Sequence, residues 1–165
     1  MFVLGIDPGL STMGYAVLER TSRRPRPIAA GAVRTSPDDP LERRLLELHT
    51  DLTGIIEEYG PAEMAIEQVF VNRNLRTATA VGRASGAIML SAAQAGLRVF
   101  EYTPSAVKMA VCGVGDAGKD QVQQVVAMRL GLDEAPKPAD AADALAIALC
   151  HLQSSGLRRA VEAAR

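Results

Sequence analysis

The sequence has few cysteines, no long apolar run and no excess of basic residues. Its two cysteines, Cys112 and Cys150, are far apart and form no C-x-x-C pair, so we expect reduced thiols rather than a disulfide framework. No stretch of about 18 uninterrupted apolar residues occurs, which excludes a helical membrane span. The start of the chain lacks a basic flank and a small-residue cleavage site, so we expect a cytoplasmic protein.

The charge balance also lacks the signature of a general DNA binder. The net charge is -1 and the pI is about 6.1, whereas sequence-independent DNA binders are usually basic overall. This counts against a nucleic-acid role unless several acids surround divalent cations, because the remaining surface is then net basic. Hydrophobic residues make up 48% of the 165 residues, which predicts a single globular domain over 1–165 with a frayed tail over about 156–165.

Short apolar runs separated by turn residues predict a mixed α/β fold. Three strand candidates come first and have short links, which favours an antiparallel meander. The strand candidates are 2–6, 14–18, 28–33, 62–67 and 97–102, and the helix candidates are 40–59, 74–95, 139–152 and two that begin near 104 and 119. This order predicts a mixed five-stranded sheet, with three antiparallel strands plus two parallel ones, and helices on both faces.

Two acids stand directly after apolar strand candidates. Asp7 follows Val3-Leu4-Gly5-Ile6, and Glu67 follows Met64-Ala65-Ile66. Taken alone, Asp7 could simply begin a turn and Glu67 could be a surface residue. If the first and fourth strands are parallel neighbours, however, both carboxylates emerge at the sheet edge where open α/β sheets bind ligands.

Two further acids, Asp140 and Asp143, lie three residues apart near the start of the last helix. They project from neighbouring positions and repel each other, although the helix dipole favours acids in a first turn. The alanines and apolar residues around them predict a helix that packs closely on the sheet, where carboxylates need a cationic partner. Four carboxylates without cysteine or histidine at ligand spacing suit Mg²⁺, or Mn²⁺ as a substitute, rather than zinc.

Two such ions can activate water and stabilise the leaving oxygen of a phosphodiester. The sequence therefore predicts a metal-dependent nuclease site that holds two ions and forms no covalent intermediate. The acids expected to act as catalytic residues and metal ligands are Asp7, Glu67, Asp140 and Asp143.

Five motifs together resemble the RuvC family of Holliday-junction resolvases, from about Phe2 to Leu152. In chain order they are GIDPG, AIEQVF, FEYTPSAVK, GKDQV and DAADALAIALCH. The resemblance implies a ribonuclease H-like fold, a homodimer, and paired symmetrical nicks in a four-way DNA junction during recombination and repair. It also implies that branch-migration proteins are partners, and it assigns the catalytic metal sites to the same four acids.

Several further residues are candidates for DNA contact. The resemblance matches Phe70 to an aromatic residue that acts on junction bases, and Lys108 and Lys119 to lysines that contact DNA near the site. By themselves, Phe70 would fit a hydrophobic core, and the lysines would fit a solvated surface. Arg73 and Arg76, with Arg83 on the same helical face as Arg76, could follow a second arm of the junction. The small residues of the 74–95 helix could serve dimer contact or intramolecular packing.

The sequence also allows three other interpretations. Gly113 to Lys119 fits the phosphate-binding pattern G-x-x-x-x-G-K, but Asp120 stands where a hydroxyl is needed and no clear strand precedes the loop. Asp7-Pro8-Gly9 resembles the first phosphate hairpin of actin-like ATPases, but the chain has room for one domain and lacks the second hairpin, so no nucleotide cofactor is expected. A junction-binding module without activity would gain nothing from acids that repel phosphate.

Overall fold

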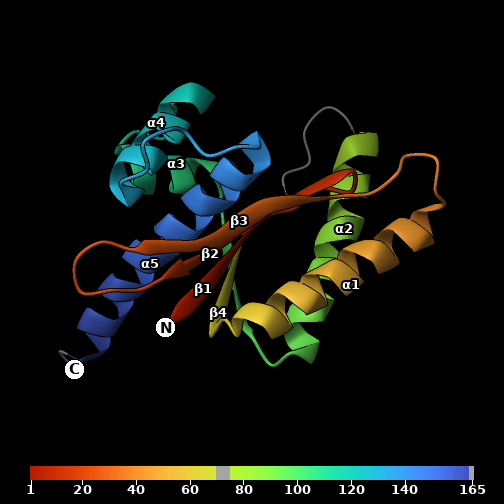
Figure 1. The fold of residues 1–165 in the computed structure, drawn as a ribbon, viewed down its shortest axis with the longest axis horizontal. Coiled ribbons are helices and arrows are strands. Elements are labelled where there is room, and N and C mark those ends of the chain that lie inside the picture. Colours follow the sequence, from red (N-terminus) through yellow and green to blue (C-terminus); the bar gives the residue numbers. More distant parts are fainter. Residues whose placement is uncertain (70–74, 164–165) are drawn as a thin grey trace.

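The computed structural model of the protein describes residues 1–69 and 75–163, with side chains as far as residue 155. A five-stranded sheet forms the middle layer, in the order β3-β2-β1-β4-β5 (Figure 1). The strands are β1 (Phe2–Asp7), β2 (Thr12–Glu19), β3 (Arg26–Arg34), β4 (Glu63–Glu67) and β5 (Arg98–Tyr102). β1, β2 and β3 pair antiparallel, whereas β4 runs parallel to both β1 and β5. The predicted mixed sheet is confirmed.

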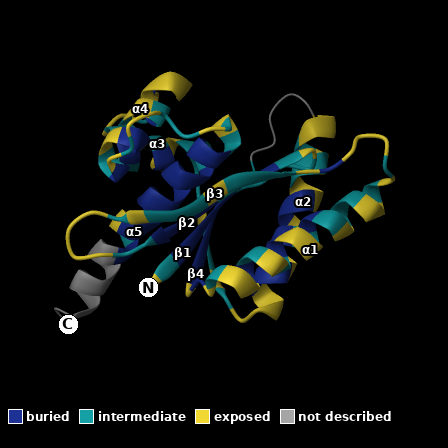
Figure 2. Cartoon of the chain, viewed as in Figure 1, coloured by how far each residue is buried: buried dark blue, intermediate teal, exposed yellow. Residues whose placement is uncertain are grey.

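Helices cover both faces of the sheet, as expected. They are α1 (Leu41–Tyr59), α2 (Leu75–Gln94), α3 (Pro104–Cys112), α4 (Lys119–Leu130) and α5 (Ala139–Ala163). α1 and α2 lie on one face, and α5 lies on the other with α3 and α4 outside it (Figure 1). Most residues of β1, β2 and β4 and of the middle of α5 are buried, whereas β3 and β5 consist of intermediate and exposed residues (Figure 2).

Side chains of the central strands alternate between these two layers, because successive residues of a strand point to opposite faces. In β1, Leu4 and Ile6 join the core beneath α1 and α2, whereas Val3 joins the core beneath α5. In β4, Ala65 also belongs to the α5 layer. The same alternation therefore directs Asp7, and both Glu63 and Glu67 at the two ends of β4, towards the α5 side.

Local signals explain where several helices begin and end. Thr103 caps α3 with a side-chain oxygen that accepts a hydrogen bond from the Ala106 amide at 3.0 Å, and Pro104 stands at the first helical position. Gly60 ends α1 in the left-handed region, with φ 55°, where glycine carries no Cβ penalty.

The last helix is longer than the sequence predicts. We expected it to end near Leu152 with a frayed tail, but α5 continues to Ala163, so that boundary is wrong. The physical reason is composition: the segment after Leu152 holds no proline and consists mainly of residues with good helix propensity, and Gly156 is its least favourable residue.

Candidate active site

Three of the predicted carboxylates face one pocket at the carboxyl ends of β1 and β4. Asp7 and Glu67 are the last residues of these two parallel neighbours, and Asp143 reaches the pocket from α5. The pocket has a volume of about 240 Å³, and its lining comprises Asp7, Glu67, Pro104, Val107, Lys108, Lys119, Val122, Asp143 and Ala146. It therefore combines three acids and two lysines with apolar walls from α3, α4 and α5.

Asp140 lies beside this pocket rather than in its lining. It precedes Asp143 by one helical turn, and its charge contributes to the pKa of Asp7. Its backbone is held against β2, because a Cβ added at Gly14 would lie only 2.1 Å from the Asp140 carbonyl oxygen. Gly14 pairs with Asp7 in the sheet register, so this close approach brings the first turn of α5 next to Asp7.

A second glycine allows the same close packing further along α5. A Cβ added at Gly5 would lie 2.3 Å from the Ala144 carbonyl oxygen and 2.8 Å from Ala148 Cβ. The helix backbone thus rests almost directly on the sheet, which only small residues on both surfaces permit. Glycine inside a strand often marks such an approach, so Gly5 and Gly14 are the sequence signal of this close packing.

The electrostatics of the pocket are dominated by like charges. Burial, followed by the charges of Asp143, Glu67 and Asp140, raises the pKa of Asp7 from 3.8 to about 7, although Lys119 opposes the shift. Burial and then Asp143 also raise the pKa of Glu67, against Lys108 and Lys119. An acid that is both partly desolvated and surrounded by carboxylates holds its negative charge at a cost, and a cation relieves it.

One lysine already supplies part of that positive charge. Lys119 Nζ lies 2.9 Å from Asp143 Oδ2. The hydrogen bond to Asp143 is the main cause that raises the pKa of Lys119, and burial opposes it. The acids of the site therefore already attract one positively charged side chain.

The donor chemistry fits a hard divalent cation. The four acids offer oxygen ligands and no sulfur or imidazole, which suits Mg²⁺ or Mn²⁺. Among the described residues, no group of three or more histidine, cysteine, aspartate or glutamate side chains is arranged closely enough to hold a metal ion. The raised pKa of Asp7 supports the fit, because burial and the neighbouring acids disfavour its charged form and a bound cation would compensate that charge.

Removal of the Asp7 charge tests how much the buried, like-charged environment of this carboxylate lowers the stability of the metal-free protein. Since the folded pKa is raised, the proton binds more tightly in the folded state, and the penalty grows as pH rises from about 4 to about 7. We expect Asp7→Asn to stabilise the metal-free protein by on the order of 2 kcal/mol at pH 8 and by little at pH 4. Thermal unfolding in a chelator at both pH values measures this. A variant that is less stable than wild type at pH 8 would contradict the assignment.

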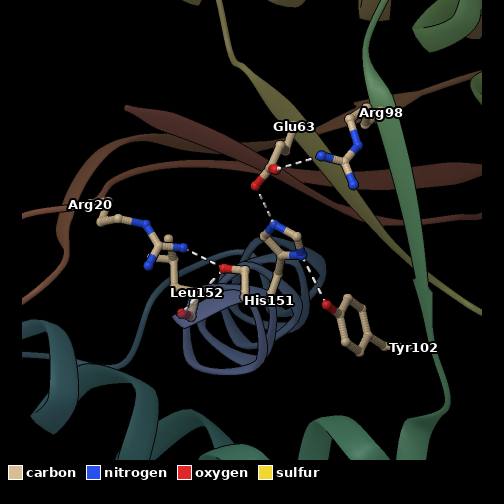
Figure 3. Close-up of polar contacts among 7 residues, drawn as sticks. Arg20, Glu63, Arg98, Tyr102, His151 and Leu152 are labelled. Carbon is tan, nitrogen blue, oxygen red and sulfur yellow. Dashed lines mark hydrogen bonds and ion pairs between the residues drawn. The ribbon is translucent and has the colours of Figure 1, made fainter. Parts of the chain in front are cut away.

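The opposite end of β4 holds a second polar cluster, which ties α5 to the sheet (Figure 3). His151 is fully buried, and its Nε2 lies 2.9 Å from Glu63 Oε2 while its Nδ1 lies 2.9 Å from the Tyr102 hydroxyl. Nε2 donates to the Glu63 carboxylate, and in the neutral form of the imidazole Nδ1 accepts from the Tyr102 hydroxyl. Arg98 approaches Glu63 at 4.0 Å. This cluster gives His151 a role in packing, whereas the sequence left both a surface role and a packing role open.

The predicted DNA-contacting residues are not all in the pocket. Lys108 and Lys119 line it, whereas Arg76 lines a separate hollow beside Leu10 and Leu41, together with Arg83. Phe70 and Arg73 lie outside the described residues. The glycine-rich segment before Lys119 connects α3 to α4, so a helix rather than a strand precedes it and the P-loop interpretation is not supported.

A mixed five-stranded sheet with acids at the ends of two parallel central strands, covered by a helix that adds further acids, is the arrangement of a ribonuclease H-like protein. A family model described as "Crossover junction endodeoxyribonuclease RuvC" matches residues 3–151. The chain belongs to this RuvC family, whose members hydrolyse phosphodiester bonds.

Individual relatives match over nearly their whole length. The RuvC protein of Desulfitobacterium hafniense is 49% identical over 157 residues, which is 95% of each chain. That of Halothermothrix orenii is 47% identical over 159 residues, which is 96% of each chain. The structure of Thermus thermophilus RuvC in complex with a Holliday junction substrate is 37% identical, with a TM-score of 0.90 over 95% of this chain and 96% of that one. The ribonuclease H-like fold is thereby confirmed.

No helix within the described part of the chain is long and apolar enough to cross a membrane.

Proposed function

We propose that this chain resolves four-way DNA junctions by divalent-metal-dependent hydrolysis of two phosphodiester bonds, as part of DNA recombination and repair. The observation that carries the proposal is the pocket in which Asp7, Glu67 and Asp143 meet Lys108 and Lys119. The similarity to a RuvC protein that was solved with a Holliday junction supports the choice of substrate.

The chain's own residues have distinct parts in this chemistry. Asp7, Glu67, Asp140 and Asp143 would hold two Mg²⁺ ions, or Mn²⁺ in their place, and such ions lower the pKa of water and stabilise a leaving oxygen. Lys108 and Lys119 would bind the phosphate backbone and keep the scissile group over the acids. The lining formed by the described residues contains no serine, threonine, cysteine or tyrosine, which favours direct attack by water over a covalent intermediate.

Junction cleavage with product mapping tests the proposal. A four-way junction that is end-labelled on each strand in turn is incubated with the protein and Mg²⁺, beside the same reaction in chelator and beside a linear duplex of the same sequence. We expect nicks at symmetrical positions in two strands of the junction, no cleavage in chelator and little cleavage of the duplex. Equal cleavage of the duplex would reject junction selectivity, and cleavage in chelator would reject the metal dependence.

Paired nicks in a two-fold substrate require two equivalent sites, so we also propose a homodimer. One face of α2 packs on α1 through Ala84, Ile88 and Ala92, while the opposite face exposes Leu90, whose exposed fraction is 56%. A Cβ added at Gly82 or Gly86 meets no atom within 4 Å, so this exposed face leaves space for close contact with a second copy. Branch-migration proteins would meet the dimer while it is on the junction.

A charge on the exposed face of α2 is expected to separate the protomers. Leu90→Asp should shift the dimer to monomer, with at least a tenfold weaker association, because burying an unpaired carboxylate costs several kcal/mol. Leu46→Asp is a matched control, since Leu46 is an α1 leucine with an exposed fraction of 61%. Sedimentation velocity of both variants measures the effect. A dimeric Leu90→Asp variant would place the interface elsewhere.

A further inference from the structure

The two lysines of the active-site pocket are not equivalent. Lys119 is the first residue of α4 and forms an ion pair with Asp143 of α5, with 2.9 Å between Nζ and Oδ2. Lys108 of α3 lines the same pocket, but among the described residues it forms no ion pair with a carboxylate. The Lys119 ammonium therefore already contacts an oxygen of Asp143, a proposed metal ligand, whereas the Lys108 ammonium contacts none of the described carboxylates in such an ion pair.

The exposure of the two partners indicates that this contact can open easily. The Lys119 side chain has an exposed fraction of 60%, whereas that of Asp143 is 26%. The lysine thus approaches from solvent on a long flexible stem, while the carboxylate stays in the pocket. Ion pairs with one exposed partner contribute little to stability, so a divalent cation that binds the acids can displace the ammonium at small cost.

We propose that Lys119 serves as a replaceable counterion: it binds Asp143 while no divalent cation is present, and it is released towards the pocket mouth when a cation takes that carboxylate. The inference rests on the proposed function, because it assumes that Asp143 is a metal ligand. Released Lys119 can then bind a phosphate of the DNA backbone. The contact therefore links metal loading to the availability of a phosphate-binding lysine.

The surrounding charges are consistent with this exchange. Asp7 and Asp140 also act on Lys119, and both favour its charged form. The acids thus attract the ammonium into the pocket when they lack another cation. Once divalent charge compensates them, the attraction on Lys119 falls and the pull of a DNA phosphate becomes the stronger one.

Metal binding in the absence of DNA tests the exchange without relying on activity. Mn²⁺ titrations followed by the electron paramagnetic resonance of free Mn²⁺ are made on wild type, Lys119→Gln, Lys119→Arg and Lys108→Gln. We expect Lys119→Gln to bind Mn²⁺ about five- to tenfold more tightly, because the competing cation is gone. Lys119→Arg keeps a competing cation and should stay within about twofold of wild type. Lys108→Gln should do the same, because among the described residues Lys108 forms no ion pair with a carboxylate.

Two further measurements distinguish displacement of Lys119 from Asp143 by the metal ion from mere long-range repulsion between lysine and metal ion. The side-chain ammonium resonance of Lys119, identified by its loss in Lys119→Arg, should shift on addition of Mg²⁺, whereas that of Lys108 should shift less. Lys119→Gln should also cut the junction more slowly although it binds metal more tightly. If Lys119 only stabilised the fold, its replacement would not tighten metal binding while it slows cleavage.

The outcomes distinguish this inference from the function on which it rests. Equal tightening of Mn²⁺ binding in Lys119→Gln and Lys108→Gln would overturn the exchange and leave only long-range repulsion. Unchanged binding in Lys119→Gln, with normal binding by wild type, would overturn the exchange and leave the nuclease proposal intact. Wild-type protein that binds no Mn²⁺ would overturn both.

Discussion

Replacement of Asp143 by asparagine is expected to lower the rate of junction cleavage by at least about 1000-fold, since the loss of several kcal/mol of charge stabilisation corresponds to that factor. Asp143 lines the pocket, contacts Lys119, and raises the pKa values of both Asp7 and Glu67, so its charge lies at the centre of the site. Asparagine has nearly the same size, and the fold should persist.

Binding of the junction should survive the same substitution. The contacts proposed to phosphate come from lysines, and removal of a nearby negative charge does not weaken them. Single-turnover cleavage in Mg²⁺ and gel-shift binding in chelator measure the two effects separately. Asp51→Asn is the control, because Asp51 is an exposed acid on α1, remote from the pocket. Cleavage by Asp143→Asn within tenfold of wild type would remove Asp143 from the catalytic set.

The second large effect is expected from one added methyl group. Gly14→Ala should reduce cleavage by about 100-fold, because a displacement of roughly 1 Å in a catalytic group can cost that much. The new Cβ would lie 2.1 Å from the Asp140 carbonyl oxygen and 2.6 Å from its carbonyl carbon. These are backbone atoms, so the start of α5 must move away from β2, and Asp140 moves with it.

A glycine with open surroundings provides the control for this substitution. A Cβ added at Gly54 of α1 meets nothing within 4 Å, and Gly54→Ala should therefore leave cleavage unchanged and stabilise the helix by about 0.5–1 kcal/mol. Cleavage rates and thermal unfolding of both variants are the measurements. Full activity in Gly14→Ala would show that the position of Asp140 is not critical.

The sequence alone predicted the mixed five-stranded sheet and the position of Asp7 and Glu67 at the same edge of it. Each strand is an apolar run bounded by turn residues, and parallel pairing of β1 with β4 brings both strand ends to one edge, as the structure confirms. Asp140 and Asp143 were placed near that edge because alanine around them predicted close packing. The catalytic and metal-binding roles of all four acids remain predictions.

Other features depend on distances that a pattern of residue types does not contain. The ion pair between Lys119 and Asp143 joins α4 to α5, and its existence depends on how these helices pack. The contacts of His151 could not be predicted from a local sequence pattern, because its partners Glu63 and Tyr102 are 88 and 49 residues away from it in the chain. The predicted end of α5 is wrong because the prediction followed the general fraying of chain termini, whereas this segment consists mainly of residues with good helix propensity.

Two positions of α5, Asp143 and His151, face the two ends of β4. Asp143 and His151 are eight residues apart, about 12 Å along a helix, and their neighbours Glu67 and Glu63 are four residues apart, about 13 Å along β4. The two spacings agree, so α5 can meet the pocket and the buried histidine cluster at once. A single residue inserted between positions 143 and 151 would rotate one part of the helix by about 100° relative to the other, so that Asp143 would leave the pocket or His151 would leave Glu63. Natural variation in chain length should therefore fall outside this segment.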